Sequence, residues 1–302
     1  MMSPALIQGL FAAVNTPRDT NGVFDSAALR NSLEFLLERG ITRFVLNGAT
    51  GEYVLTTPKE LHEIVAAAAQ IIGVRARFLC GVGSASLRGC LENAKAALDL
   101  GASGILLPMP YFFPYAQDDL EAFCREAARR LPVPILLYNL PNFTSGLAPA
   151  TVRTLIADCP NIVGIKDSSG NLEILRMLSA SGLTACRVVG SDRVIGEALR
   201  EGLCDGAVSG IASVMPELLL SVFEHSKRTD SPEFRAAVTA LDEFIAAIAP
   251  FPVPWGLKWI AETRGICAAN FALPVSPRRA AQARELQEWF RSWRPELVPA
   301  VR

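Results

Sequence analysis

The chain has 302 residues, of which 50% are hydrophobic and 20% are charged, so it can bury a large core and does not have the composition of a disordered protein. Its formal net charge of -1 provides no basic field for nucleic acid or anionic lipid, and no apolar run is long enough to span a bilayer. The first residues lack the basic and apolar regions of a signal peptide, so we expect a cytoplasmic protein.

Short apolar runs alternate with helix-like runs along most of the chain. The predicted strands are residues 9–14, 43–46, 77–80, 104–107, 134–138, 162–166, 187–190 and 206–208. They do not alternate polar and apolar residues, as expected of parallel strands that are buried on both faces. Between the first two strands, four leucines form an apolar helical stripe, with Ser26 as the predicted N-cap and Gly40 after the helix end. Thr57 and Pro58 open a second helix as its cap and first residue.

Eight strand–helix units in the first ~225 residues predict a (β/α)8 TIM barrel. An open doubly wound sheet is the main competitor, but no GxGxxG segment follows the first strand. From about Thr229 the pattern changes to three helix-like runs, residues 233–249, 255–264 and 277–293. We therefore predict a barrel over residues 1–228 and a C-terminal helical extension over residues 229–302.

Seven cysteines and two histidines limit the scope for thiol and metal chemistry. The cysteine number is odd and no CxxC pair occurs, which is typical of free thiols in a reducing compartment. A nucleophilic cysteine would need a histidine partner, but His62 and His225 both lie in helix-like stretches, which disfavours a Cys–His catalyst and a histidine metal site. We predict no metal site and no cofactor.

Lys166, at the end of the predicted strand 162–166, is the first candidate for chemistry. The chain has only five lysines, and the other four lie in stretches that predict polar helical or loop settings. An ammonium at the end of a buried strand loses hydration, which favours the neutral amine. A neutral amine can attack a carbonyl and form an imine. The alternative is a strand-end lysine whose head group stays in water.

Two more segments follow predicted strands, and the carboxyl ends of barrel strands carry the active site. Gly48-Ala49-Thr50-Gly51-Glu52 has glycines beside a hydroxyl, so its backbone N–H groups could hold an anion. Tyr138 ends the fifth strand. Each feature has an ordinary alternative, a tight turn and a core tyrosine. Together with Lys166 they predict carbonyl chemistry on a small carboxylate. A phosphate-binding isomerase, using glycine-rich residues 206–210, would leave the lysine and tyrosine unexplained.

The chain resembles the dihydrodipicolinate synthase / N-acetylneuraminate lyase family nearly from end to end. The segments that carry the resemblance are Gly48-Ala49-Thr50-Gly51-Glu52, Tyr138-Asn139-Leu140-Pro141 and Gly164-Ile165-Lys166-Asp167. The resemblance implies a (β/α)8 barrel with a C-terminal helical extension, commonly in a homotetramer or homodimer. It also implies a class I aldolase, which forms a Schiff base with pyruvate or another 2-oxo acid and uses no cofactor.

The resemblance also implies roles for particular residues. Lys166 would form the Schiff base, and Tyr138 would donate and accept protons near the imine. The backbone N–H groups of Ala49 and Thr50, with the Thr50 hydroxyl, would hold the substrate carboxylate. Val208 would line the pyruvate pocket with its backbone carbonyl.

Three positions depart from the synthase branch of the family. Ala49 lacks a hydroxyl that the synthase has, and Phe112 aligns with a tyrosine that enters the neighbouring subunit's site. Tyr111 is one position away and would substitute only if the loop shifted. Phe143 stands near the place of an arginine that binds the second substrate's carboxylate. These departures disfavour a dihydrodipicolinate synthase proper and favour an aldolase-like lyase.

The second substrate stays open. Asp192 aligns with an acidic residue that binds sugar hydroxyls in the lyase branch, which suits a 2-keto-3-deoxy acid; its alternative role is to cap the next helix. Phe112 and Phe143 suit an aromatic or aliphatic aldehyde better. A dehydratase or deaminase, and a non-catalytic barrel that only binds a 2-oxo acid, are further alternatives.

Overall fold

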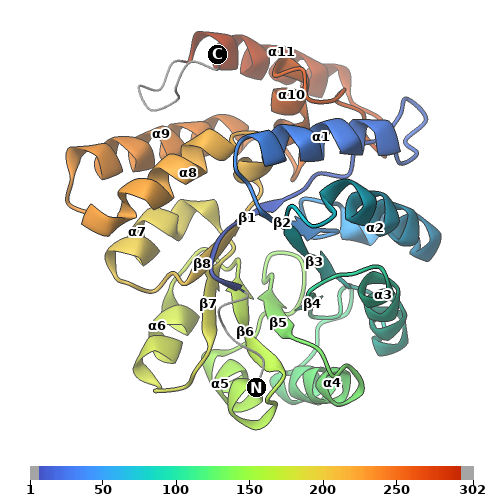
Figure 1. Cartoon of the computed structure of the whole chain (residues 1–302), viewed down its shortest axis with the longest axis vertical. Coiled ribbons are helices and arrows are strands. Elements are labelled where there is room, and N and C mark those ends of the chain that lie inside the picture. Colours follow the sequence, from blue (N-terminus) through green and yellow to red (C-terminus); the bar gives the residue numbers. More distant parts are fainter. Residues whose placement is uncertain (1–6, 294–302) are drawn as a thin grey trace. The chain divides into compact units, whose positions relative to one another are not determined.

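Eight parallel strands form a closed barrel in which each strand neighbours the next along the chain (Figure 1). The computed structural model describes residues 7–293. The strands are β1 (Gly9–Ala13), β2 (Arg43–Leu46), β3 (Arg77–Gly81), β4 (Ile105–Pro108), β5 (Ile135–Asn139), β6 (Ile162–Asp167), β7 (Cys186–Val189) and β8 (Gly206–Ser209). The predicted barrel is confirmed, with each strand within one residue of its expected ends, and the open-sheet alternative is wrong.

The strands are buried because their apolar runs face both the barrel interior and the surrounding helices. Every residue of β4 and β5 is buried. The register of β5 and β6 pairs Tyr138 with Lys166 and Asn139 with Asp167. The strand pairing thus places the two residues with candidate chemistry side by side at the carboxyl ends of adjacent strands.

The described residues fall into two compact units, each combining two stretches of chain. The first contains residues 7–11 and 78–208. Its helices are α3 (Leu87–Asp99), α4 (Gln117–Arg130), α5 (Pro149–Asp158), α6 (Glu173–Ala180) and α7 (Ile195–Arg200), with the 3-10 helix η3 (Asp192–Val194) before α7. Helices α3 to α6 pack as successive neighbours (Figure 1).

The second unit contains residues 12–77 and 209–293. Its helices are α1 (Ser26–Glu38), α2 (Pro58–Ile72), α8 (Pro216–His225), α9 (Pro232–Ile248), α10 (Trp255–Thr263) and α11 (Pro277–Ser292), with 3-10 helices η2 (Tyr53–Leu55), η4 (Ile211–Ser213) and η5 (Ser226–Arg228). Helix α1 packs on α2, α8 on α9, and α10 on α11. The last three helices match the predicted helical runs, while the boundary at residue 228 stays a prediction.

Capping side chains define the helix starts. The prediction of Ser26 as the first N-cap is wrong: Asp25 holds that position, and its carboxylate accepts hydrogen bonds from the backbone N–H groups of Ala27 and Ala28, both at 3.0 Å. Asp25 has extended backbone angles, whereas Ser26 is already helical. The Thr57 cap of α2 is confirmed, since its hydroxyl accepts from the Glu60 N–H at 3.2 Å.

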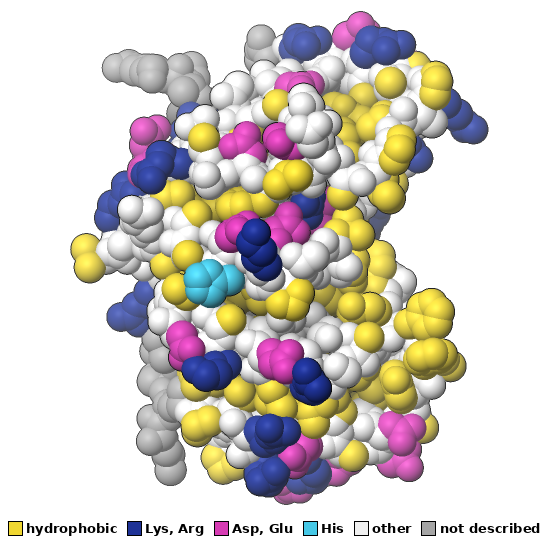
Figure 2. Space-filling view, turned by 90° about the vertical axis from the view of Figure 1, so that its right-hand side faces the viewer, with side chains coloured by type: hydrophobic (Ala, Val, Ile, Leu, Met, Phe, Trp, Pro, Cys, Tyr) yellow, Lys and Arg dark blue, Asp and Glu magenta, His cyan; other side chains and the backbone are white. Residues whose placement is uncertain are grey.

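One face of the molecule carries side chains of both charges. On the face drawn in Figure 2, Lys and Arg side chains are interspersed with Asp and Glu side chains, and neither sign dominates. Among the helices of residues 7–293, none has the length and apolar character that crossing a bilayer requires.

Candidate active site

Lys166 and Tyr138 form the centre of the candidate site. Both side chains are buried, with 3% of each residue exposed, and the Lys166 Nζ lies 3.8 Å from the centroid of the Tyr138 ring. Burial lowers the pKa of the Lys166 amine to about 7, and the negative charge of Asp192 opposes this shift only in part. The lysine head group is therefore not in water, so the alternative of a solvated strand-end lysine is wrong.

Gly190, directly after β7, leaves the space that Lys166 occupies. A Cβ atom on Gly190 would lie 2.8 Å from Lys166 Cε and 2.2 Å from Ser168 Oγ, closer than packed atoms approach. Any larger residue would displace the lysine chain or the serine. Sequence reasoning assigned no role to Gly190 or Ser168, because the contact depends on how β6 and β7 pair.

Hydrogen bonds of Asn139 and Asp167, here called the Asn139–Asp167 clamp, link the carboxyl ends of β5 and β6. The Asn139 amide donates to the Asp167 carboxylate at 2.9 Å and accepts from the Leu147 backbone N–H at 3.0 Å. Asp167 also accepts from the Ser169 backbone N–H at 3.0 Å, while burial raises the pKa of its carboxyl. The clamp ties the end of β6, next to Lys166, to the loop of residues 140–147. This gives a physical reason for the Tyr-Asn and Lys-Asp pairs in the sequence.

Asp192 and Val208 belong to the same unit as Lys166. Asp192 is half-buried and opens η3, but Ser191 holds the N-cap position and no side chain caps that helix, so the predicted capping role of Asp192 is wrong. Its charge acts on the Lys166 amine instead. Val208 is buried within β8, where its backbone is part of the barrel wall.

Ala49 and Thr50 lie in the second unit, in a tight turn between β2 and η2. The Glu52 N–H donates to the Ala49 carbonyl at 3.0 Å, which closes the turn. Gly51 is required there, because a Cβ atom would lie 2.9 Å from the Asn47 backbone. Thr50 is 8% exposed. The anion-binding role of this turn stays a prediction.

Lys258 is a buried lysine that sequence reasoning missed. We expected the four lysines other than Lys166 to lie in polar settings, but Lys258 in α10 is 2% exposed and its Nζ lies 2.6 Å from Glu52 Oε2. The available signal was its position within the apolar run of residues 255–261, Trp-Gly-Leu-Lys-Trp-Ile-Ala. A lysine inside such a run needs a buried carboxylate partner.

Exposed aromatic side chains stand on two loops of the first unit. Phe112 and Phe143 are 85% and 60% exposed, and they occupy the loops after β4 and β5. The two loops are joined by the Tyr115 backbone N–H, which donates to the Ser145 hydroxyl at 2.9 Å. The loop that carries Phe143 is thus held both to its neighbour and, through Asn139, to β6.

Two buried cysteines have raised thiol pKa values. Burial raises the pKa of Cys80 to about 12 and that of Cys90 to about 11, which disfavours their thiolate forms. Across residues 7–293, no three His, Cys, Asp or Glu side chains are grouped so that they could hold a metal ion.

Comparisons with known proteins agree with the resemblance seen in the sequence. A model of the Dihydrodipicolinate synthetase family matches residues 6–292. The 4-hydroxy-tetrahydrodipicolinate synthase of Sorangium cellulosum is 30% identical over 96% of this chain and 97% of its own, and synthase 1 of Streptomyces coelicolor is 34% identical over 89% of this chain and 86% of its own. The dihydrodipicolinate synthase of Acinetobacter baumannii, solved in complex with pyruvate, is 26% identical with a TM-score of 0.88, over 97% of this chain and 100% of its own.

Proposed function

The chain belongs to the dihydrodipicolinate synthetase family, and we propose that Lys166 is the residue through which it forms a Schiff base. The protein is a Schiff-base aldolase or lyase that forms or cleaves a C–C bond of a 2-oxo acid, with pyruvate as the imine-forming unit. The observation that carries the assignment of Lys166 is its buried amine against the Tyr138 ring, with a pKa of about 7. At neutral pH, a large fraction of this amine is a free nucleophile.

The proposed reaction begins when the Lys166 amine attacks C2 of pyruvate and water leaves. The protonated imine withdraws electrons, so C3 loses a proton and the resulting enamine attacks the carbonyl carbon of an aldehyde. Hydrolysis of the new imine releases the product and restores the amine; cleavage follows the reverse order. Tyr138, the polar residue beside Lys166, is proposed to move protons in these steps.

The other candidate residues are proposed to hold the substrate. The backbone N–H groups of Ala49 and Thr50 and the Thr50 hydroxyl would bind the carboxylate, and the Val208 carbonyl would line the pyruvate pocket. Asp192 would accept hydrogen bonds from substrate hydroxyls. Support comes from the topology, because the carboxyl ends of all strands in a parallel barrel meet at one rim.

We propose that the second substrate is an aldehyde that carries no carboxylate on the part that contacts Phe143. An exposed phenyl ring on the loop after β5 offers apolar contact and no charge for a carboxylate. Asp192 favours a hydroxylated 2-keto-3-deoxy acid as the product or substrate. Dihydrodipicolinate synthase itself is the second candidate, because the relatives from Sorangium cellulosum and Streptomyces coelicolor bear that name. We also propose a cytoplasmic location and a homotetramer or homodimer, on the family resemblance alone.

Intact-mass measurement after addition of pyruvate and borohydride tests the proposed imine. The wild-type chain should gain one pyruvate, less one water and plus two hydrogens, and Lys166→Ala should gain nothing. Lys95→Ala, which removes an exposed lysine paired with Asp99, is the matched control and should react like the wild type. An adduct that persists in a folded Lys166→Ala protein would reject the assignment.

A panel of aldehydes and 2-keto-3-deoxy acids, assayed for pyruvate consumption or release, then identifies the reaction. Turnover with uncharged aldehydes supports the proposed lyase. Turnover only with the carboxylate-bearing semialdehyde of the synthase reaction would favour the second candidate. Imine formation without any turnover would instead favour a barrel that only binds the 2-oxo acid.

A further inference from the structure

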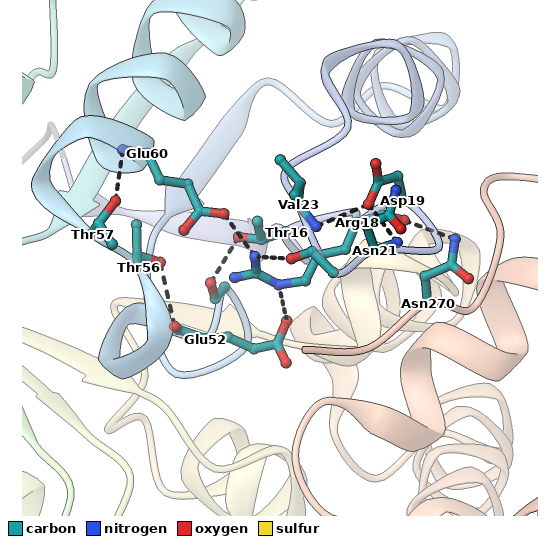
Figure 3. Close-up of polar contacts among 12 residues, drawn as sticks. Thr16, Arg18, Asp19, Asn21, Val23, Glu52, Thr56, Thr57, Glu60 and Asn270 are labelled. Carbon is teal, nitrogen blue, oxygen red and sulfur yellow. Dashed lines mark hydrogen bonds and ion pairs between the residues drawn. The ribbon is translucent and has the colours of Figure 1, made fainter. Parts of the chain in front are cut away.

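Glu52, at the end of the turn that carries Ala49 and Thr50, belongs to a cluster of four charged side chains, of which three are buried and Glu60 is half-buried. Its members are Arg18, Glu52, Glu60 and Lys258, all in the second unit, and Figure 3 shows the Arg18 guanidinium between the carboxylates of Glu52 and Glu60. Two cations balance two carboxylates. Buried charges are costly unless they are paired, so a fold that keeps three of them together holds them in a defined geometry.

Glu52 connects this cluster to the turn. It is the last residue of Gly48–Glu52 and has a left-handed backbone with a φ of 59°, which a non-glycine residue adopts only when its surroundings hold it there. Its Oε2 atom lies 2.6 Å from Lys258 Nζ and 3.7 Å from Arg18 Nε. The first contact is a charge-assisted hydrogen bond and the second is a longer Coulombic attraction.

Lys258 is itself held in place. Its Nζ also donates to the Asn270 carbonyl at 3.2 Å, and the Asn270 amide donates to the Arg18 carbonyl at 2.9 Å. Arg18 Nη1 donates to Glu60 at 2.7 Å and to the Gly22 carbonyl at 2.9 Å. Groups other than Glu52 therefore hold both cations in position, and the two cations can hold the Glu52 carboxylate.

Two further contacts hold the same turn. The Thr16 hydroxyl donates to the Gly51 carbonyl at 2.7 Å (Figure 3). Thr50 packs against Gly210, since a Cβ atom on that glycine would lie 2.9 Å from Thr50 Oγ1. Neighbouring residues therefore contact both the Thr50 side chain and the Gly51 carbonyl of the turn.

We propose that Lys258 and Arg18 are positioning residues, which act through Glu52 to hold the Ala49–Thr50 turn in the conformation that binds the 2-oxo acid carboxylate. This inference rests on the proposed function of the turn. Helix α10, which carries Lys258, would then support substrate binding without contacting the substrate.

The test compares the pyruvate concentration that gives half-maximal imine trapping in wild-type protein and Lys258→Met. Methionine keeps the length and apolar character of the side chain but leaves Glu52 without its nearest cation. We expect the half-saturating concentration to rise by about tenfold or more, because breaking a buried ion pair disrupts the group that it held. The maximal amount of adduct should not change. The pH at which the trapping rate is half-maximal should not change either, because no member of the cluster contributes to the shifted pKa of Lys166.

The controls separate positioning from general stability. Lys59→Met, which removes an exposed lysine paired with Glu63, should leave the half-saturating concentration unchanged. If Lys258→Met does not fold, the double variant Glu52→Gln/Lys258→Met removes both charges and avoids an unpaired buried ion, and we expect a rise of about fivefold. An unchanged half-saturating concentration in folded protein, whatever its melting temperature, would overturn the inference. Failure of the proposed function would show differently, as trapping that persists in Lys166→Ala.

Discussion

The Lys166 amine nitrogen lies 3.8 Å from the centroid of the Tyr138 ring, in a place where both side chains are buried. Two effects oppose each other there. The face of the ring attracts an ammonium, whereas burial removes its hydration and favours the neutral amine. Because the pKa of Lys166 falls from 10.5 to about 7, burial dominates. The pair therefore presents a nucleophilic amine at neutral pH, next to a hydroxyl-bearing ring.

The rate of imine trapping should follow the deprotonation of Lys166. With saturating pyruvate and cyanoborohydride, we expect the rate to rise with pH and to reach half its maximum at about pH 7. Asp192 raises the pKa of Lys166, so Asp192→Asn should move the midpoint to lower pH. Asp118→Asn, at the start of α4, is the control and should leave the midpoint in place. A wild-type midpoint near 10 would contradict the burial of the amine.

Tyr138→Phe should separate imine formation from turnover. The variant keeps the ring beside Lys166 and removes only the hydroxyl, so the amine stays buried and pyruvate should still be trapped. Turnover of the full substrate should fall by about a hundredfold or more, because a positioned proton donor typically contributes that much. Trapping and turnover are measured on the same preparation. Equal loss of both would mean that the hydroxyl is already needed for imine formation, and not only for the later steps.

Replacing Lys166 with methionine should stabilise the protein in a pH-dependent way. Below pH 7 both the folded and unfolded states carry the proton, and the folded state bears the full cost of the buried charge. Between about pH 7 and 10.5 the unfolded state binds the extra proton, so wild-type stability rises with pH. The advantage of Lys166→Met should therefore shrink by about 1.4 kcal/mol per pH unit in this window.

Urea unfolding of both proteins at several pH values measures this difference. Lys95→Met, an exposed lysine, should show no such trend relative to wild type. A constant difference between Lys166→Met and wild type across the window would show that the lysine titrates normally.

The barrel and the centre of the site were predictable because short apolar strands and signature segments are local features of the sequence. Lys166 and Tyr138, the predicted strand ends, are the penultimate residues of their strands, and the register of β5 and β6 places them together. Local signals were less reliable at the first helix, where Asp25 and Ser26 are both good N-caps and only the backbone angles decide between them.

Contacts between distant parts of the chain were not predictable. Lys258 and Glu52 are 206 residues apart, and nothing in either segment specifies the other as its partner. The space that Gly190 leaves for Lys166 likewise depends on the pairing of β6 with β7. Such contacts follow from the fold as a whole, since they require two surfaces that meet only after the strands have paired.

Phe143→Arg should change the choice of aldehyde and not the formation of the imine. The ring is 60% exposed on the loop after β5, so the substitution should alter the free energy of unfolding by no more than about 0.5 kcal/mol. An arginine there can form paired hydrogen bonds with a carboxylate, whereas the phenyl ring offers only apolar contact. We expect kcat/KM to fall about tenfold for aromatic aldehydes and to rise for an aldehyde that bears a carboxylate.

Phe113→Arg provides the matched control for this change of specificity. It adds the same charge on the joined loop after β4, where Phe113 is 62% exposed. If a general positive field attracts acidic aldehydes, both variants should gain activity toward them by similar factors and lose it in high salt. If Phe143 faces the second substrate, only Phe143→Arg should change the preference, and half-maximal trapping with pyruvate should stay the same in both. A Phe143→Arg protein with unchanged preference would remove this residue from the acceptor site.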